Sequence, residues 1–225
     1  TGGGVSVGGS KAGKVGFASI ERTLIALNYA DRGAGIDISA QSTLSLKHAT
    51  VRENKAKMNM VTENGGNGGG IFAKKSSNVY ISYTKFLSNK AQKNGGAICL
   101  MESSDTLIHT SIFISNNANN DGGVLSAINS DSIEIAFTSI TNNLVDGFGG
   151  ALAIDMSTIS VFRVTFGNNY AKYGGAIYMK TSVMQFLSNL YRKHNQNDEV
   201  QQEVIVSDNI FAGVIESNVS TTFKV

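Results

Sequence analysis

The side chains in this sequence that are best suited to chemistry are carboxylates. Two carboxylates held close together can hydrolyse a glycosidic bond, and a cluster of them can bind calcium. The candidates are spread along the chain at Asp37, Glu102, Asp105, Asp131, Glu134 and Asp155. Asp131 and Asp155 follow Gly-Gly pairs by eight and five residues, so they do not occupy equivalent positions. The sequence therefore predicts no catalytic residue, no cofactor and no metal site.

Three other features could be read as chemical sites, and none is specific. His194, Asp198 and Glu199 form one histidine with loosely spaced carboxylates, which is typical of a solvated loop. Cys99 is the only cysteine, so an intrachain disulfide is excluded and a packed small side chain is expected. The glycine-rich stretch 8–14 lacks the GK[ST] ending of a phosphate-binding loop. We therefore expect no nucleotide site.

Composition excludes several classes of partner. The formal net charge of the 225 residues is +2, which is too small to favour nucleic acid or an anionic membrane surface. No run of 18 apolar residues is present, so membrane insertion is not expected. The chain is 41% hydrophobic and contains no proline. This composition is compatible with a body of stacked strands that need every backbone donor.

The elements that must position these side chains follow a repeat. Gly-Gly pairs begin at Gly69, Gly95, Gly122, Gly149 and Gly174, so successive pairs are 26, 27, 27 and 25 residues apart. An apolar residue three places before an asparagine keeps the same period. These pairs are Ile25 and Asn28, Val51 and Asn54, Phe86 and Asn89, Phe113 and Asn116, Ile140 and Asn143, and Phe166 and Asn169. Self-similarity at this period indicates a solenoid.

The residue types of each unit predict strands. Apolar residues two apart would share an inward face, as in Leu44 and Leu46, Val79 and Ile81, Ile133 and Ile135, and Ile159 and Val161. We predict an all-β fold, a right-handed parallel β-helix of about seven turns with about 26 residues per turn. Corners are expected at the glycines Gly70, Gly96, Gly123, Gly150 and Gly175. The asparagines Asn28, Asn54, Asn89, Asn116, Asn143 and Asn169 are expected to form a hydrogen-bonded ladder.

These motifs also carry a family resemblance. GGAI occurs at Gly95 and Gly174 with variants at Gly122 and Gly149, and FxxN begins at Phe86, Phe113 and Phe166. The combination resembles the repeat of the chlamydial polymorphic outer-membrane proteins, autotransported surface adhesins with a β-helical passenger of the pectin-lyase-like type. The resemblance implies a β-helix at the cell surface. No autotransporter barrel is recognised, so autotransport itself is not predicted.

Two departures from the repeat are expected. The segment 55–68 is longer than its equivalents and is predicted to bulge from one corner, and the polar stretch 191–203 is predicted as a second insertion. Phe186 and Asn189 repeat the FxxN spacing only eleven residues after Gly175, so the period is expected to falter there. We assign residues 1–225 to a single β-helix domain, a segment of a longer solenoid.

A binding surface is predicted near the first insertion. Lysines and tyrosines gather there, and the candidate residues are Lys74, Lys75, Tyr80, Tyr83 and Lys85. An acidic glycan would suit such a surface, and solvated lysines that keep a β-rich surface soluble are the alternative. A mixed outward column of His48, Tyr83, Thr110, Phe137 and Arg163 is interpreted as ordinary surface.

The sequence thus favours an extracellular or cell-surface element that is structural or adhesive and that presents an elongated β-helical face or assembles end to end into filaments. Its expected partners are further turns of the same solenoid or other protein chains at both ends, and glycans. Asn218 opens the only Asn-X-Ser/Thr glycosylation sequon. The alternatives are a polysaccharide lyase or hydrolase of the β-helix type and a glycan-binding module without catalysis.

Overall fold

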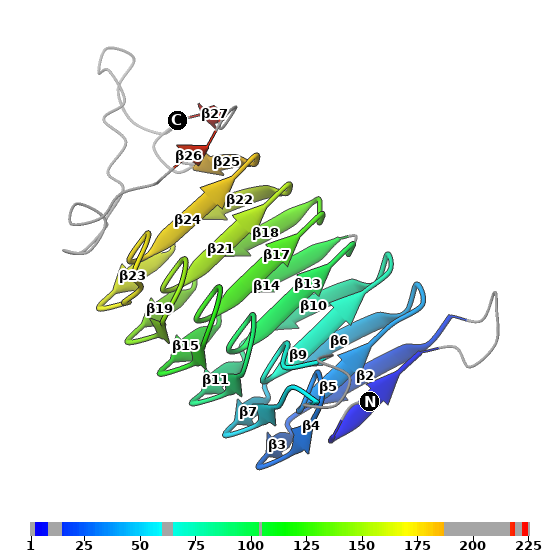
Figure 1. Cartoon of the computed structure of the whole chain (residues 1–225). Coiled ribbons are helices and arrows are strands. Elements are labelled where there is room, and N and C mark those ends of the chain that lie inside the picture. Colours follow the sequence, from blue (N-terminus) through cyan, green and yellow to red (C-terminus); the bar gives the residue numbers. More distant parts are fainter. Residues whose placement is uncertain are drawn as a thin grey trace.

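The described part of the chain is built from strands alone. The structure, a computed structural model, describes residues 3–8, 15–59, 65–103, 105–186, 217–218 and 222–224. Within these ranges every regular element is a β-strand, and every strand pairing is parallel. Figure 1 shows the strands stacked in coil after coil along one axis. The predicted all-β parallel β-helix is confirmed.

Two eight-stranded sheets form the long walls. The first sheet contains β1 (Val5–Val7), β5 (Ile36–Ile38), β9 (Ile71–Lys74), β13 (Ile98–Met101), β17 (Leu125–Ile128), β21 (Leu152–Asp155), β24 (Ile177–Lys180) and β26 (Ser217–Asn218). The second contains β2 (Phe17–Glu21), β6 (Thr43–Lys47), β10 (Asn78–Ser82), β14 (Thr106–His109), β18 (Ile133–Ala136), β22 (Thr158–Phe162), β25 (Val183–Phe186) and β27 (Thr222–Lys224).

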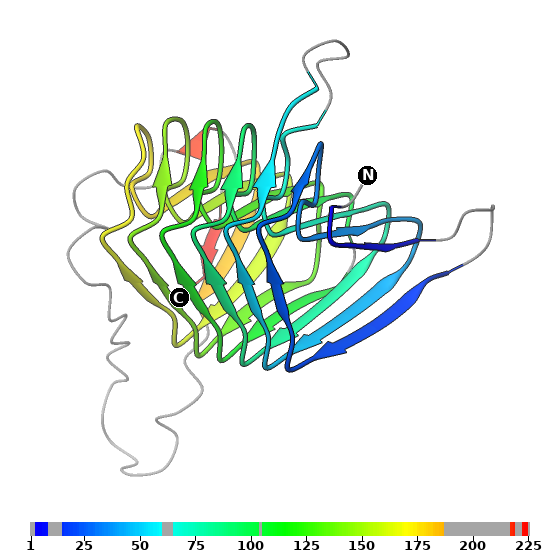
Figure 2. The same cartoon turned by 90° about the horizontal axis from the view of Figure 1, so that it is seen from below.

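Two sheets of shorter strands complete each coil. The third sheet contains β3 (Leu24–Ala26), β7 (Thr50–Arg52), β11 (Lys85–Leu87), β15 (Ile112–Ile114), β19 (Ser139–Thr141) and β23 (Thr165–Gly167). The fourth contains β4 (Tyr29–Ala30), β8 (Lys55–Ala56), β12 (Lys90–Ala91), β16 (Asn117–Ala118) and β20 (Leu144–Val145). Figure 2 shows how the chain passes through the sheets in turn within each coil.

The coil length is close to the sequence period. Ile71, Ile98 and Leu125 are paired partners in the first sheet, at steps of 27 residues. The third sheet has six strands, so the described residues form about six coils, compared with the seven expected. The commonest step between paired residues is 27, one residue longer than the predicted period of about 26.

The core lies between the sheets and is formed by the predicted inward residues. In the second sheet, Leu44, Val79 and Ile133 are all at most 2% exposed. In the third sheet, the rings of Phe86 and Phe113 stack with their centroids 4.7 Å apart and their planes 9° apart. Burial of one such side chain contributes about 1.5–3 kcal/mol. Because each coil buries several, the stack stabilises coils that could not fold alone.

The first insertion begins later than the sequence indicates. Lys55 and Ala56 form β8, which pairs in register with β4 and β12, so these two residues belong to the regular coil. The chain regains the stack at Asn67, which forms a parallel bridge with Arg32. Residues 60–64 and the second insertion, 191–203, lie outside the described residues.

The period does not falter at Phe186 in the way the FxxN spacing suggests. Phe186 pairs with Val161 of the second sheet, whereas the phenylalanines of the repeat stand in the third sheet. β24 and β25 therefore continue the regular coil in register with β21 and β22. The FxxN spacing at Phe186 is a coincidence of sequence, because backbone register assigns this residue to another sheet.

Candidate binding surface

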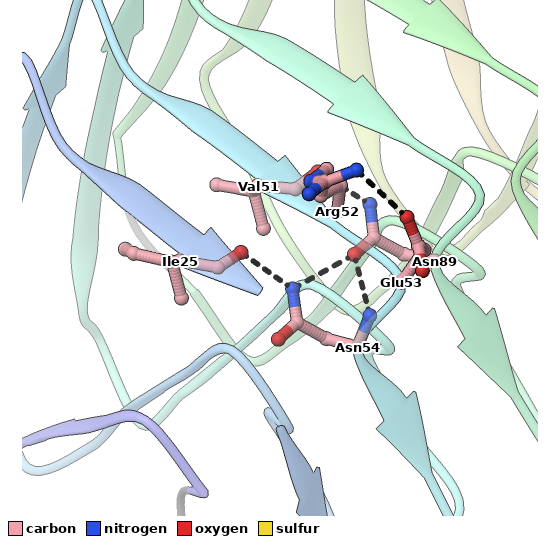
Figure 3. Close-up of polar contacts among 6 residues, drawn as sticks. All are labelled: Ile25, Val51, Arg52, Glu53, Asn54 and Asn89. Carbon is pink, nitrogen blue, oxygen red and sulfur yellow. Dashed lines mark hydrogen bonds and ion pairs between the residues drawn. The ribbon is translucent and has the colours of Figure 1, made fainter. Parts of the chain in front are cut away.

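The repeated asparagines form a continuous ladder inside the corner between the third and fourth sheets. Asn54 donates to the side-chain oxygen of Asn89 twice, from its backbone nitrogen at 3.2 Å and from Nδ2 at 3.0 Å. The same Nδ2 also donates to the backbone oxygen of Ile25, and Nδ2 of Asn89 donates to that of Val51 (Figure 3). The pattern recurs along Asn28, Asn54, Asn89, Asn116, Asn143 and Asn169. From Asn54 onward these side chains are buried, so they hold the corner and do not contact a ligand.

The glycine pairs serve two different purposes. The first glycine of a pair has positive φ, as at Gly95 (68°) and Gly122 (64°). The second lies under the next coil, where a Cβ on Gly96, Gly123 or Gly150 would collide with a glycine carbonyl oxygen. Gly175 stands in this same column.

Gly70 departs from the register that the sequence indicates. Ile71 pairs with Ile98, so Gly68 and Gly69 match Gly95 and Gly96, and Gly70 matches Ala97. The run of three glycines concealed this shift of one residue, because any two of them satisfy the motif.

The five residues predicted as a binding surface lie along one coil. Lys74 ends β9 of the first sheet, Tyr80 points outward from β10 of the second, and Lys85 begins β11 of the third. Lys75 and Tyr83 occupy the two intervening corners. Burial and the neighbouring Arg32 guanidinium lower the pKa of the Lys74 ammonium. Lys74 and Lys75 share the corner between the first and second sheets, whereas Tyr83 and Lys85 share the corner between the second and third sheets. The five residues therefore lie at two separate corners with Tyr80 on the strand between them.

Most carboxylates predicted as candidates remain separate. Glu102, Asp105, Asp131 and Glu134 are exposed side chains. Asp37 is buried and its Oδ1 lies 3.4 Å from Nε of Arg32. Cys99 is also buried, and burial raises the pKa of its thiol. Within the described ranges, no group of three His, Cys, Asp or Glu side chains could hold a metal ion.

One carboxylate missed by the sequence analysis interacts with a predicted one. Burial and the carboxylate of Asp155 raise the pKa of Asp121. Nζ of Lys180 lies 3.5 Å from Oδ2 of Asp155, whose Oδ1 is buried without a hydrogen-bond partner among the described residues. The signal in the sequence was the polar residue before the first three glycine pairs, Asn67, Asn94 and Asp121; Phe148 and Tyr173 take this position in the next two coils.

A column of exposed aromatic and cationic side chains marks the corner between the second and third sheets. The residues Arg22, His48, Tyr83, Thr110, Phe137 and Arg163, here called the corner column, turn the chain with φ values of 45° to 50°. The members from Arg22 to Phe137 each donate the backbone N–H to the next coil, as Tyr83 does to the oxygen of His109 at 3.2 Å. The column therefore runs parallel to the helix axis.

Ring contacts join neighbouring members of the corner column. His48 and Tyr83 stack with centroids 4.9 Å apart and planes 16° apart. Phe137 contacts Phe162 edge to face at 5.0 Å, and the guanidinium carbon of Arg163 lies 5.8 Å from the Phe137 ring centroid. Tyr83 is nevertheless 50% exposed and Phe137 42% exposed. The column thus presents large rings that are held in place yet open to solvent.

The backbone of this corner makes its side chains unexpected. Left-handed φ values cost L-residues about 1–2 kcal/mol, and glycine or asparagine usually occupies such positions. At the corner between the third and fourth sheets, four of the equivalent residues are small and polar: Ser88, Ser115, Asn142 and Asn168. Tyr83 and Phe137 bear the same conformation with bulky rings that gain little burial. Leu27 and Met156 are likewise large, exposed and left-handed at other corners, so what distinguishes this corner is its several aromatic rings in one column.

The corner column is also positively charged. Lys47 directly precedes the column residue His48. Lys85 is the first outward residue after Tyr83. Glu21 is the one carboxylate at these two positions of the coils, and its Oε1 lies 3.8 Å from Nε of Arg22. The sequence predicts this column as ordinary surface, because neither its ring contacts nor its φ values can be read from residue types.

The repeat motifs of this chain match a known family. Residues 83–100 and 163–180 each match the Chlamydia polymorphic membrane protein repeat. Both matches begin at a corner-column residue and run into the first sheet, and they are three coils apart. The resemblance indicated by GGAI and FxxN is therefore confirmed. No curated protein and no solved structure matches the chain significantly. Among the described residues, no helix is long and apolar enough to cross a membrane.

Proposed function

We propose that this β-helix of Chlamydia polymorphic membrane protein-type repeats is an extracellular, adhesive element of a cell-surface protein. The name of the repeat supports a location at the outer membrane or cell surface. The observation that carries the adhesive role is the corner column, with Tyr83 and Phe137 exposed at strained backbone positions. A column of this kind offers a partner one continuous line of contacts.

The body of the protein suits this role because it is rigid. Buried apolar side chains and the asparagine ladder connect every coil to the next. Side chains on such a support lose little conformational freedom when a partner binds, which favours affinity. The rings of His48 and Tyr83 are already stacked in the folded protein, so the conformational entropy of these side chains is lost during folding and not on binding.

Adhesion of coated beads tests the proposal. Beads that carry the whole chain are applied to an epithelial cell layer, and beads with the double variant Tyr83→Asn, Phe137→Asn are compared. Asparagine accepts left-handed φ, so the fold should persist while adhesion falls about tenfold or more. Met156→Asn is the matched control, because Met156 is 49% exposed with a φ of 46° at a different corner.

Equal adhesion by the double variant and the wild type would place the adhesive surface elsewhere. The location is tested separately by labelling intact cells that express the natural protein with an antibody raised against this chain. Labelling only after the cells are permeabilised would contradict a surface location.

A second candidate function rests on Asp121 and Asp155. Two interacting carboxylates, one with a raised pKa, are the groups that an enzyme needs to cleave polysaccharides. The nearby Lys180 ammonium could neutralise an acidic sugar. Release of reducing ends from polygalacturonate by the wild type, with loss of release in Asp121→Asn, would favour this enzyme. Absence of release would leave adhesion as the better account.

A further inference from the structure

The outward face of the fourth sheet carries a row of lysines. Lys55 of β8 and Lys90 of β12 are register partners, so their side chains leave neighbouring coils side by side. Lys57 follows on the same face as Lys55, because Ala56 between them is buried. Tyr29 of β4 is the register partner of Lys55 on the preceding coil. These residues, Tyr29, Lys55, Lys57 and Lys90, are all exposed and are here called the lysine row.

Two ammonium groups of the lysine row gather at one ring. Nζ of Lys55 lies 5.5 Å from the centroid of the Tyr29 ring, and Nζ of Lys57 lies 5.4 Å from it. Both distances are within the range of a cation–π interaction. The Tyr29 ring is itself 55% exposed. The ring therefore holds two positive charges close together at the surface of the sheet.

The backbone beneath the lysine row is fixed by the asparagine ladder. Lys55 directly follows Asn54 of the ladder. Lys90 directly follows Asn89, whose Oδ1 accepts a hydrogen bond from Nδ2 of Asn54 at 3.0 Å. The backbone nitrogen of Lys90 also donates to the backbone oxygen of Asn54 at 2.8 Å. The backbone positions of the two lysines are thus set before any ligand binds, which lowers the entropic cost of binding.

Carboxylates do not neutralise the lysine row. Among the described residues, no carboxylate forms an ion pair with a lysine of the row. Glu53 lies near the row in the sequence, but its Oε1 is 3.0 Å from Nη1 of Arg52. Asp31 directly follows β4 and is exposed. Within this described part of the chain, three lysines therefore stand beside one carboxylate that is not paired with a cation.

The two lysines in register repel each other, and the fold does not require them. Like charges at paired positions destabilise a sheet. The same outward position holds Asn117, Leu144 and Tyr170 in later coils. Solubility is served better by interspersed charges of both signs. An anionic polymer that lies along the row would remove the repulsion, so the arrangement favours a ligand of this kind.

We propose that the lysine row binds a linear anionic polysaccharide that runs along the helix axis over Tyr29, Lys55 and Lys90. Lysine ammonium groups are point charges with rotatable donors, so they suit sulfate or carboxylate groups without a shaped pocket. The surface location that the repeat family supports favours a polysaccharide over nucleic acid as the polyanion. This inference goes beyond the adhesive function and does not rest on the corner column, which lies between two other sheets.

Fluorescence anisotropy with labelled polymers tests the proposal on the whole chain. The probes are heparin, which carries sulfates and carboxylates, hyaluronate, which carries carboxylates alone, and neutral dextran. At least one anionic polysaccharide should bind, with an affinity that falls as salt rises, and the better of the two identifies the acidic group. Dextran should bind at least about tenfold more weakly. Binding of neither anionic polysaccharide, or tighter binding of single-stranded DNA or phosphatidylglycerol vesicles, would overturn the proposal.

A double variant locates the binding. Lys55→Gln, Lys90→Gln should lower the affinity for the anionic polysaccharide about tenfold or more. The slope of the logarithm of affinity against the logarithm of salt concentration should fall by about 2, one for each lysine. The thermal stability of this variant at low salt should equal or exceed that of the wild type, because the repulsion between paired lysines is removed.

The matched control removes the same charge elsewhere. Lys47 and Lys75 are exposed and lie away from the fourth sheet, so Lys47→Gln, Lys75→Gln should change the affinity by less than about threefold. Glutamine suits the corner of Lys75, because Gln41 adopts a φ of 58° at the same corner of the preceding coil. Equal losses in the two double variants would show that net charge governs binding and would overturn the site.

A single variant keeps the site testable if Lys55→Gln, Lys90→Gln does not fold. Lys57→Gln leaves the paired positions intact and should reduce the salt slope by about 1. An unchanged slope in that variant would overturn the site.

The corner-column variant separates this inference from the adhesive function. Polysaccharide binding that persists in Tyr83→Asn, Phe137→Asn while bead adhesion falls would support both surfaces. Loss of polysaccharide binding in that variant would move the polysaccharide site to the corner column and overturn the lysine row. No polysaccharide binding by the wild type, together with lost bead adhesion in that variant, would reject the lysine row and keep the adhesive column.

Discussion

The side-chain oxygen of Asn116 accepts two hydrogen bonds from Asn89, from the backbone nitrogen at 3.1 Å and from Nδ2 at 3.0 Å. Nδ2 of Asn116 in turn donates to the backbone oxygen of Phe86 at 3.0 Å. The side-chain amide of Asn116 therefore pairs with two N–H donors of Asn89 and with the backbone oxygen of Phe86, all in the preceding coil. Because both asparagines are buried, none of these groups could turn to water if the amide were removed.

Substitution of Asn116 by alanine should destabilise the whole stack. Two donors of Asn89 and the backbone oxygen of Phe86 would lose partners, and a buried unsatisfied group costs about 1–3 kcal/mol. We expect Asn116→Ala to lower the free energy of unfolding by about 3 kcal/mol in a urea titration. Asn119→Ala is the control, since Asn119 is exposed and should change stability by less than about 0.5 kcal/mol. Similar stability of the two variants would show that the ladder contributes little.

Gly123 should tolerate no side chain. A Cβ there would collide with the carbonyl oxygen of Gly150 in the next coil, a backbone atom that cannot rotate aside. We expect Gly123→Ala to lower stability by more than about 3 kcal/mol or to prevent folding.

Gly70→Ala is the matched control for this position. Gly70 stands in the column that contains Ala97, Val124 and Ala151, although its own Cβ would lie 2.7 Å from the oxygen of Ala97. This substitution should be the milder of the two by thermal unfolding. A larger loss at Gly70 would contradict the register that the structure assigns.

The repeat made the fold predictable because equivalent positions in successive coils have the same environment and so carry similar residues. Phe86, Phe113 and Phe166 recur with their asparagines at the period of the coil, so the sheet and the face of each residue follow from spacing alone. The three glycines 68–70 were assigned one residue out of register. A motif of two glycines cannot choose among three, whereas the pairing of Ile71 with Ile98 can.

The candidate site was less predictable for a physical reason. His48, Tyr83 and Phe137 were placed in one column from the sequence, but spacing does not reveal φ. Spacing also does not show that the His48 and Tyr83 rings stack, and an exposed tyrosine on its own is ordinary surface. The interaction of Asp121 with Asp155 was missed because the two residues stand at different points of their coils. It depends on how the segment before each glycine pair lies against the first sheet, which no periodicity records.

The column of inward rings in the third sheet provides a graded test of packing. Phe113 is fully buried and stacks on Phe86, while Ile140 occupies the next position of the same column. We expect Phe113→Ala to cost about 3–5 kcal/mol because a cavity is left. Phe113→Ile should cost clearly less, since the neighbouring coil already accepts isoleucine. Chemical unfolding of both variants measures the difference, and equal losses would argue against tight packing in this column.

The raised pKa of Asp121 predicts how stability depends on pH. Burial and the Asp155 carboxylate make the folded protein hold the Asp121 proton more tightly than the unfolded chain does. In the unfolded chain the pKa of this carboxyl is 3.8. The contribution of Asp121 to the free energy of unfolding is fully present below pH 3.8 and is lost as pH rises through the pKa of Asp121 in the folded protein. Asp121→Asn removes the cost of holding a charged carboxylate at this buried position beside Asp155. Relative to the wild type, the variant should therefore gain stability as pH rises from 3.8 toward neutrality.

Urea titrations at several pH values, with Asp131→Asn as the control for loss of one exposed carboxylate, measure this difference. A variant whose advantage shrinks as pH rises would show that Lys180, whose ammonium lowers the pKa of Asp121, outweighs burial and Asp155.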